Sequence, residues 1–362
     1  MPNHVAPDHP WVTEHPEYFI QGSAEDLARD PASYIAAGAY VIACGKDPYF
    51  PAWPDVVQLN VFDLGLRATI IATVSDIASQ CDGMRCDMAM LVNTTIFQRT
   101  WGERAGTAPP TEYWYDVIGS VKTIYPQVRF IAEVYWDMEW ELQQLGFDFC
   151  YDKRLYDRLE HESASSVRGH LLADSAYQEK LLRFVENHDE PRTVVAFPGA
   201  KGRVAAVASL TLPGGKLVYH GQFEGRSVRP PVFLRRQPTE TADRALLEFY
   251  QRLLPALRLP ALRAGSWSLC EDRGWPDNPS HEHLVAWCWR HETQRVLVVV
   301  NLSDSAAQAL VMLPWPDLAD QSWNLHDLLG DTQLQRDGNM LLQEGLYVAL
   351  GAWGYHLFTL TP

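Results

Sequence analysis

The segment GMRCDMA, residues 83–89, places an arginine two positions before an aspartate. Residues i and i+2 of a β-strand point to the same face, so Arg85 can hold the carboxylate of Asp87 in a fixed direction. A neighbouring guanidinium also favours the ionised carboxylate, which then stays anionic at neutral pH. This pattern alone is a weak signal, because the same two residues could form a structural ion pair.

Two further carboxylate segments follow, and in each an apolar run leads into the acid. FIAEVYW (130–136) carries Glu133, and FVENHDE (184–190) carries His188 and Asp189. Short apolar runs bounded by polar residues are consistent with buried strands of a parallel sheet. Acids at the carboxyl ends of such strands lie where (β/α) folds place their chemistry. We therefore expect one site that draws on three strands.

These segments resemble the second, third and fourth signature regions of glycoside hydrolase family 13, the α-amylase family. The first region of that family ends in an Asn-His pair, and PNH at residues 2–4 is similar to it. The resemblance runs from Asn3 to about Arg226 and into the C-terminal part. The order of the motifs makes the match specific, whereas no single motif would.

The resemblance implies a role for each acid. In a retaining glycoside hydrolase one carboxylate attacks the anomeric carbon and one carboxylic acid protonates the leaving oxygen, the two standing about 5–5.5 Å apart. Asp87 would be the nucleophile, Glu133 the general acid and base, and Asp189 would hold the ring hydroxyls. Arg85 would orient Asp87. A general acid must keep its proton until it is needed, so we expect the pKa of Glu133 to be raised.

The resemblance also implies residues that contact the sugar. His188 and His4 would donate hydrogen bonds to hydroxyls of the bound ring, and Tyr135 and Trp136 could stack on neighbouring rings. A structural role is the alternative for each of the four. His188 has the stronger functional case, because it lies beside Asp189 within the motif.

Calcium is a question that the resemblance raises. Many family members bind Ca²⁺ through the Asn of the first region and acids of an inserted domain. Asn3 matches that Asn, but Asp26, Asp30 and Asp47 lack the spacing of a calcium loop. The chemistry itself needs no metal, so we expect no cofactor and leave Ca²⁺ binding open.

Strand and helix patterns alternate along the first part of the chain, as in a parallel (β/α)8 TIM barrel. We expect a catalytic barrel over residues 1–262, with a short inserted loop region at about 8–57. That insertion should contain a weak strand at 40–43 and then a turn-rich tail. Residues 263–362 alternate between apolar and polar types, which predicts an antiparallel β-sandwich domain.

The front of the barrel has no counterpart in the sequence. An amylase-type barrel has eight strands, and the Asn-His motif ends the third, yet here it occupies residues 3–4. A barrel without its first two to three strands would expose unpaired strand edges. We expect a partial, N-terminally truncated barrel whose open edge is covered in a homo-oligomer. A fragment and a small rearranged barrel are the alternatives.

The composition limits the possible binding partners of the protein and its cellular compartment. The chain of 362 residues has a formal net charge of −15, which argues against nucleic acid or an anionic membrane as partner. No apolar run reaches 18 residues and no signal peptide is visible. Six cysteines without a C-x-x-C pair are interpreted as buried thiols. We therefore expect a cytoplasmic protein.

The functional expectation is a retaining enzyme that cleaves α-1,4-glucosidic bonds in α-glucans or maltooligosaccharides. The reaction would pass through a covalent glycosyl intermediate on Asp87. A transglycosylase would carry the same residues. A catalytically inactive glucan-binding or assembly relative is the alternative from another class. The sequence does not separate hydrolysis from transfer, nor does it fix chain-length or linkage preference.

Overall fold

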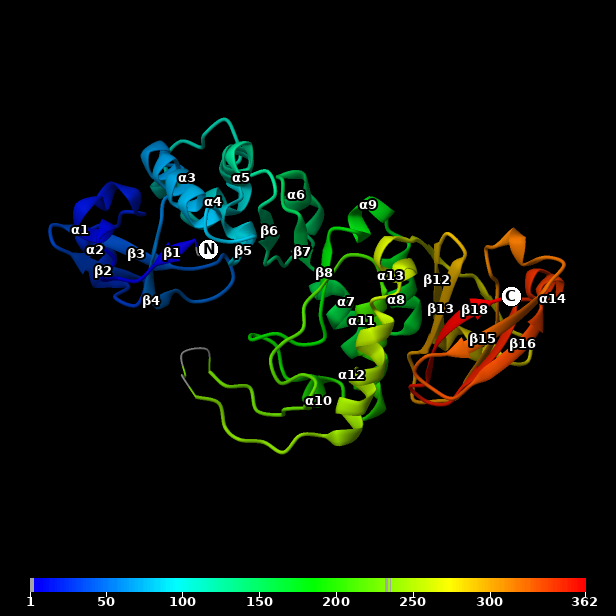
Figure 1. The fold of residues 1–362 in the computed structure, drawn as a ribbon. Coiled ribbons are helices and arrows are strands. Elements are labelled where there is room, and N and C mark those ends of the chain that lie inside the picture. The colour runs from blue at the N-terminus through cyan, green and yellow to red at the C-terminus, as the bar shows by residue number, and fades with distance from the viewer. Residues whose placement is uncertain (1–2, 232–233, 235) are drawn as a thin grey trace. The chain divides into compact units, whose positions relative to one another are not determined.

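The computed structural model describes the chain except for residues 1–2, 232–233 and 235. Two compact units make up the chain, Met1–Tyr151 and Asp152–Pro362 (Figure 1). Each unit has its own buried core.

The first unit starts with a small antiparallel sheet of strand order β1-β4-β3-β2. Its strands are β1 (His4–Val5), β2 (Tyr34–Ala37), β3 (Tyr40–Gly45) and β4 (Trp53–Gln58). Pro2, which begins the PNH segment, lies outside the described residues. Through β1, the Asn-His motif joins the sheet of the inserted region, with His4 opposite Gln58.

The expected turn-rich tail of the insertion is wrong, because Trp53–Gln58 forms a strand. Pro54 lies near the start of this strand, where the pairing with β3 shifts register between Cys44 and Gly45. A proline is tolerated at such an irregularity, since its missing N–H breaks no regular ladder hydrogen bond.

The rest of the first unit alternates strands and helices. Strands β5 (Gly83–Cys86), β6 (Arg129–Ala132) and β7 (Phe149–Tyr151) pair in parallel in that order. The helices of the unit are α1 (Trp11–Glu14), α2 (Ala24–Arg29), α3 (Leu64–Ala78), α4 (Thr94–Trp101), α5 (Tyr113–Ile124) and α6 (Glu139–Gln144).

Helices α3 and α5 pack against each other, and a buried arginine ties them together. Arg67 of α3 forms an ion pair with Asp116 of α5 at 2.5 Å and donates to the carbonyl of Val61 at 3.1 Å. Asp63 caps α3 by accepting from the amide of Leu66 at 2.7 Å. These contacts fix the helix that leads into β5 and the predicted catalytic motif.

The second unit contains two parallel strands, β8 (Leu181–Arg183) and β9 (Gly215–Lys216). Its helices are α7 (Lys153–His161), α8 (Ala164–Leu171), α9 (Ser175–Gln178), α10 (Thr193–Ala196), α11 (Ala200–Thr211), α12 (Arg244–Ala256), α13 (Pro260–Ala264) and α14 (Gly338–Gln343). A buried carboxylate, Asp152, caps α7 and contacts His170 and Arg183 at 3.1 and 3.2 Å. Burial alone would raise the pKa of Asp152, but His170 and Arg183 lower it overall.

The chain ends in an antiparallel β domain. One sheet has the order β10-β12-β13-β18-β15-β16 and the other has the order β11-β14-β17. Their bounds are β10 (Ser266–Leu269), β11 (Asp272–Arg273), β12 (Leu284–His291), β13 (Gln294–Asn301), β14 (Ala307–Val311), β15 (Ser322–Asp327), β16 (Gln333–Asp337), β17 (Leu346–Leu350) and β18 (Tyr355–Thr361). An apolar cluster of residues from both sheets forms the core of this domain.

Strand β12 is buried on both faces rather than on one. Ala286 and Cys288 belong to the core of the β domain. On the opposite face, Trp289 donates from its indole nitrogen to the carbonyl of Thr211, at the end of α11, at 2.8 Å. The larger sheet is therefore covered by helices of the same unit as well as by its own core.

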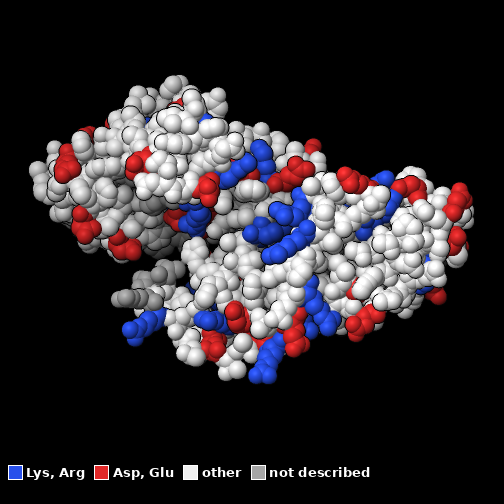
Figure 2. Space-filling model, viewed as in Figure 1, with Lys and Arg blue, Asp and Glu red and all other residues white. Residues whose placement is uncertain are grey.

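The surface charges and most of the cysteines lie as the composition predicts. Figure 2 shows Asp and Glu side chains spread over the face drawn, with Lys and Arg among them. Five of the six cysteines are buried as predicted, but Cys81 is exposed because it lies in the turn between α3 and β5. Within the described residues, we find no helix with the length and apolar character of a membrane span.

An ion pair between α8 and the β domain generates a stability prediction. Arg168 of α8 contacts Asp272 of β11 with both amino groups, at 2.6 and 2.7 Å, and the Asp272 side chain is 7% exposed. We expect Arg168→Met to lower the free energy of unfolding by roughly 3 kcal/mol, because it leaves a buried carboxylate without its partner. Thermal and urea denaturation followed by circular dichroism would measure the change.

A nearby exposed pair supplies the control. Arg273 and Glu271 are 60% and 82% exposed and stand 3.9 Å apart. Arg273→Met should therefore change the stability by no more than about 0.5 kcal/mol. Equal melting of the Arg168 variant and the wild type would contradict the prediction.

Candidate active site

Two of the predicted catalytic acids lie side by side because their strands are neighbours. In the parallel pair β5–β6, Cys86 is opposite Ala132, so Asp87 and Glu133 directly follow paired residues. The amide of Glu133 donates to the carbonyl of Cys86 at 3.0 Å, and the amide of Ala89 donates to the carbonyl of Glu133 at 2.9 Å. The backbone thus fixes both acids at the carboxyl end of the sheet.

One guanidinium joins these two acids. Arg85 contacts Asp87 through Nη1, as predicted, and it also lies 2.9 Å from Oε1 of Glu133 through Nη2. The second contact was not predicted from the sequence. Burial opposes the charge on Arg85, but Glu133, Tyr151 and Asp87 raise its pKa overall, so it stays protonated.

The two acids differ in their surroundings. The side chain of Glu133 is 4% exposed, whereas that of Asp87 is 31% exposed. Oε2 of Glu133 accepts from the amide of Met88 at 2.7 Å, and Oε1 accepts from the hydroxyl of Tyr135 at 3.1 Å. Met88 has a left-handed backbone, with φ of 41°, and this turn directs its N–H at the carboxylate.

These contacts bear on the proton that Glu133 would carry. Burial favours the protonated acid, whereas the donors from Arg85, Met88 and Tyr135 favour the carboxylate. The raised pKa expected for Glu133 therefore stays a prediction.

The predicted aromatic pair divides into two roles. Tyr135 directs its hydroxyl to Glu133, which makes it a partner of the acid rather than a flat platform. Trp136 and the following Asp137 both have left-handed backbones, with φ of 64° and 61°. The ring of Trp136 meets the ring of Tyr49 edge-on, with centroids 5.0 Å apart.

Tyr49 is a site residue that sequence reasoning missed. It lies in the loop between β3 and β4 and is 55% exposed. Asp47 shapes this loop by accepting from the amides of Tyr49 and Phe50 at 2.6 and 2.8 Å. Arg99 of α4 donates to the Tyr49 hydroxyl at 3.2 Å. An Asp followed by Pro and two aromatics is the turn signal that could have revealed it.

His4 lies within electrostatic reach of Asp87, which brings the first and second motifs together. Its Nδ1 is 3.0 Å from Oδ1 of Asn3, and its ring contacts Trp53 with centroids 5.7 Å apart. Burial lowers the pKa of His4, while Asp87 and Asp55 act in the opposite direction. A neutral ring that donates to Asn3 would present Nε2 to a ligand as an acceptor.

The third acid belongs to the second unit. Asn187 forms a tight turn by accepting from the amides of Asp189 and Glu190, both at 2.8 Å. In this turn Nε2 of His188 lies 3.0 Å from Oδ2 of Asp189, and the side chains are 36% and 45% exposed. The meeting of Asp189 with Asp87 and Glu133 at one sugar stays a prediction.

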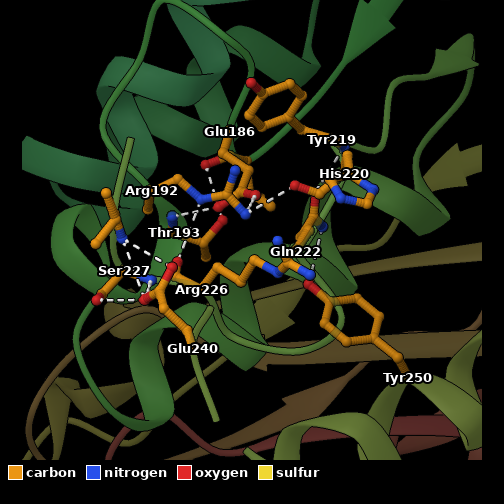
Figure 3. Close-up of polar contacts among 12 residues, drawn as sticks. Glu186, Arg192, Thr193, Tyr219, His220, Gln222, Arg226, Ser227, Glu240 and Tyr250 are labelled. Carbon is orange, nitrogen blue, oxygen red and sulfur yellow. Dashed lines mark hydrogen bonds and ion pairs between the residues drawn. The ribbon is translucent and has the colours of Figure 1, made fainter. Parts of the chain in front are cut away.

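A buried ion pair next to this turn was also missed. Glu186 and Arg192 flank the turn in the sequence, and their side chains meet at 2.9 Å with exposures of 1% and 0% (Figure 3). An Arg three positions after the His-Asp pair is the signal that could have revealed it. The loop at residues 219–226 lies against this arginine.

Asn3 and two of the acids considered for calcium, Asp26 and Asp47, have other partners in the structure. Among the described residues, no group of three or more His, Cys, Asp or Glu is placed to hold a metal ion. Asp26 is an ion-pair partner of Arg104 and Arg29, both at 2.7 Å. Asp47 accepts from backbone amides, and Asn3 contacts His4.

Comparison with known proteins gives two curated relatives, and no family model matches the sequence. α-Amylase MalA of Haloarcula japonica is 26% identical over 264 residues, which is 70% of this chain and 36% of the relative. α-Amylase 3 of Dictyoglomus thermophilum is 22% identical over 283 residues, which is 71% of this chain and 53% of the relative. The chain thus spans between about a third and about half of these relatives.

Solved structures agree with the relatives. The maltogenic α-amylase AmyB of Thermotoga neapolitana superposes with a TM-score of 0.71 at 17% identity, covering 100% of this chain and 77% of that one. The α-amylase of Geobacillus thermoleovorans, solved with acarbose, gives 0.69 at 16% identity, covering 99% and 76%.

The chain is similar in sequence to two α-amylases over about 70% of its length, and it shares the fold of solved α-amylases. The expected fold class is confirmed: parallel strands with helices, typical of a partial barrel, precede an antiparallel β domain. In this fold, Asp87 and Glu133 follow adjacent parallel strands.

The neighbourhood of His4 generates a prediction about its titration. We expect a pKa below the usual value of about 6.5, and Asp87→Asn should lower it further because the substitution removes a negative charge that stabilises the imidazolium. NMR titration of the imidazole carbon and nitrogen shifts would measure both values. Asp55→Asn, the matched control, should cause a smaller decrease. An unchanged His4 pKa in the Asp87 variant would show that the first two motifs do not meet.

Proposed function

We propose that this chain is a retaining glycoside hydrolase that acts on α-1,4-linked glucans or maltooligosaccharides. The observation that carries the proposal is the shared guanidinium of Arg85, which contacts Asp87 and Glu133 at once. The curated relatives, named as α-amylases, and the solved structure with acarbose support α-glucans as the substrate class.

In the first step, a carboxylate oxygen of Asp87 attacks the anomeric carbon while Glu133 gives its proton to the departing glycosidic oxygen. Arg85 engages Oδ1 of Asp87, which leaves Oδ2 as the attacking oxygen. The product is a glycosyl ester on Asp87 and a shortened glucan. The contact with Arg85 places a positive charge beside the attacking carboxylate and fixes its direction.

In the second step, Glu133 takes a proton from an incoming hydroxyl, which attacks the anomeric carbon and releases Asp87. Water as the incoming molecule gives hydrolysis, and a sugar hydroxyl gives transglycosylation. Asp189 and His188, half-exposed in their turn, would hold ring hydroxyls. Trp136, whose ring is held by an edge-on contact with Tyr49, would pack on the face of a neighbouring sugar.

A non-catalytic glucan-binding protein is the second candidate, and one observation favours it. Glu133 accepts from Met88 and Tyr135 and contacts Arg85, which stabilises a carboxylate rather than the protonated acid that the first step needs. Substrate binding would have to weaken at least one of these contacts for catalysis to proceed.

The catalytic proposal predicts that Glu133→Gln and Asp87→Asn each lower the release of reducing sugar from soluble starch by about 10²–10⁴-fold or more. Glu25→Gln, at an exposed position of α2, is the matched control and should keep wild-type rates. With an α-maltosyl fluoride substrate, azide should restore turnover of Glu133→Ala and give the α-glycosyl azide. If the wild type and both variants release reducing sugar at the same background rate, the chain is a glucan-binding protein and not an enzyme.

Product analysis separates the two enzymatic outcomes. A hydrolase should convert maltoheptaose only into shorter chains, whereas a transglycosylase should also form chains longer than the input. High-performance anion-exchange chromatography of early time points would distinguish them.

We also propose that the chain self-associates. In the described part of the chain, β5 pairs only with β6, so one edge of the parallel sheet has no strand partner. Unpaired edges favour association with another chain. Size-exclusion chromatography with light scattering should therefore give at least twice the chain mass of 41.0 kDa. A stable, monodisperse monomer at tens of micromolar would rule the proposal out.

A further inference from the structure

A buried ion pair closes the turn that carries Asp189. Glu186 precedes this turn and Arg192 follows it, and Nη2 of Arg192 lies 2.9 Å from Oε1 of Glu186. The other oxygen of Glu186 accepts from the amide of Thr193 at 2.5 Å. Both charged side chains are excluded from solvent, at 1% and 0% exposure. The pair therefore fixes the two ends of the turn at its base.

Arg192 also binds a second loop, residues 219–226, through hydrogen bonds. Its Nη2 donates to the carbonyl of His220 at 3.0 Å and its Nε donates to the carbonyl of Arg226 at 3.2 Å (Figure 3). Its guanidinium lies over the ring of Tyr219, 4.8 Å from the centroid. The loop therefore contacts the guanidinium through two backbone carbonyls and one aromatic ring.

The backbone of this loop is shaped to fit the guanidinium. Gly221 has φ of 87°, and a Cβ at this position would come within 2.9 Å of Nη2 of Arg192. The amide of Arg226 closes the loop by donating to the carbonyl of Gly221 at 3.1 Å. A side chain at residue 221 would therefore disturb both the backbone and the arginine contact.

The far side of the same loop is held by α12 and the segment before it. Gln222 donates to the hydroxyl of Tyr250 at 2.9 Å. Ser227 donates through its amide and its hydroxyl to Glu240, both at 2.8 Å. With one side anchored in this way, Arg192 links the position of the loop to the base of the Asp189 turn. Arg229, just beyond the loop, donates separately to the carbonyl of Asp189.

We propose that Arg192 is a positioning residue that locks the His188–Asp189 turn to the loop at 219–226 and so sets how Asp189 meets the sugar. The inference rests on the proposed role of Asp189 in glucan binding. Lysine cannot replace this arginine, because one ammonium group cannot match a planar fork that serves a carboxylate and two carbonyls together. An apolar pair could fill the same volume but could not hold the loop.

The test compares four variants: Arg192→Lys, Arg192→Met, the double variant Glu186→Leu/Arg192→Met, and Arg244→Lys as an exposed control in α12. Removing one partner should lower the melting temperature, and the double variant should recover much of it because no unpaired buried charge remains. In spite of that recovery, kcat/KM for maltoheptaose should stay about 10–100-fold below the wild type, mainly through KM, because the sugar-holding turn is misplaced.

A measurement that does not depend on activity completes the test. Hydrogen exchange should be faster at the amides of residues 221–226 in Arg192→Lys and in the double variant, and unchanged in Arg244→Lys. Wild-type exchange and kinetics in Arg192→Lys, or full recovery of kcat/KM in the double variant, would overturn the positioning role. Faster exchange in a chain whose wild type neither cleaves nor binds maltoheptaose would instead support the lock and reject the proposed function.

Discussion

The geometry of the candidate site depends on one guanidinium that serves two carboxylates. Arg85 contacts Asp87 and Glu133, and without it two acids at adjacent strand ends would repel each other in a poorly solvated place. The shared cation places one positive charge between the exposed acid and the buried acid. It also joins the two acids into one ion-paired cluster at the ends of adjacent strands.

Strand ends and their acids were predictable from the sequence, because apolar runs that end on a carboxylate leave a clear local pattern. Asp87 and Glu133 lie where that pattern places them. The second contact of Arg85, with Glu133, was not predictable, since it depends on the pairing of β5 with β6. Tyr49 was missed for the same reason: it reaches Trp136 from a loop more than eighty residues earlier in the chain. The strand at Trp53–Gln58 was hidden by Pro54, near its start.

Arginines paired with buried carboxylates organise much of the second unit. Arg183 contacts Asp152, Arg192 contacts Glu186 and Arg168 contacts Asp272, and each of these carboxylates is almost fully buried. Such pairs add little net stability compared with apolar residues of the same volume, but breaking one is costly. These pairs fix the orientation of the groups they join, because a planar guanidinium donates hydrogen bonds only in fixed directions. Tertiary pairing of this kind leaves little trace in a single sequence.

Backbone strain is present in the turns that follow the strands of Asp87 and Glu133, as it is in three turns of the β domain. Non-glycine residues with positive φ are uncommon, and in the described chain three of them, Met88, Trp136 and Asp137, directly follow the strands of Asp87 and Glu133. Each such residue costs of order 1–3 kcal/mol and persists only where its surroundings hold it. The strained backbone at Met88 directs its amide to the carboxylate of Glu133. The strained backbone at Trp136 places its ring against the ring of Tyr49. A fold that retained these motifs only as structural remnants would gain stability by relaxing both turns, so their retention agrees with the proposed site.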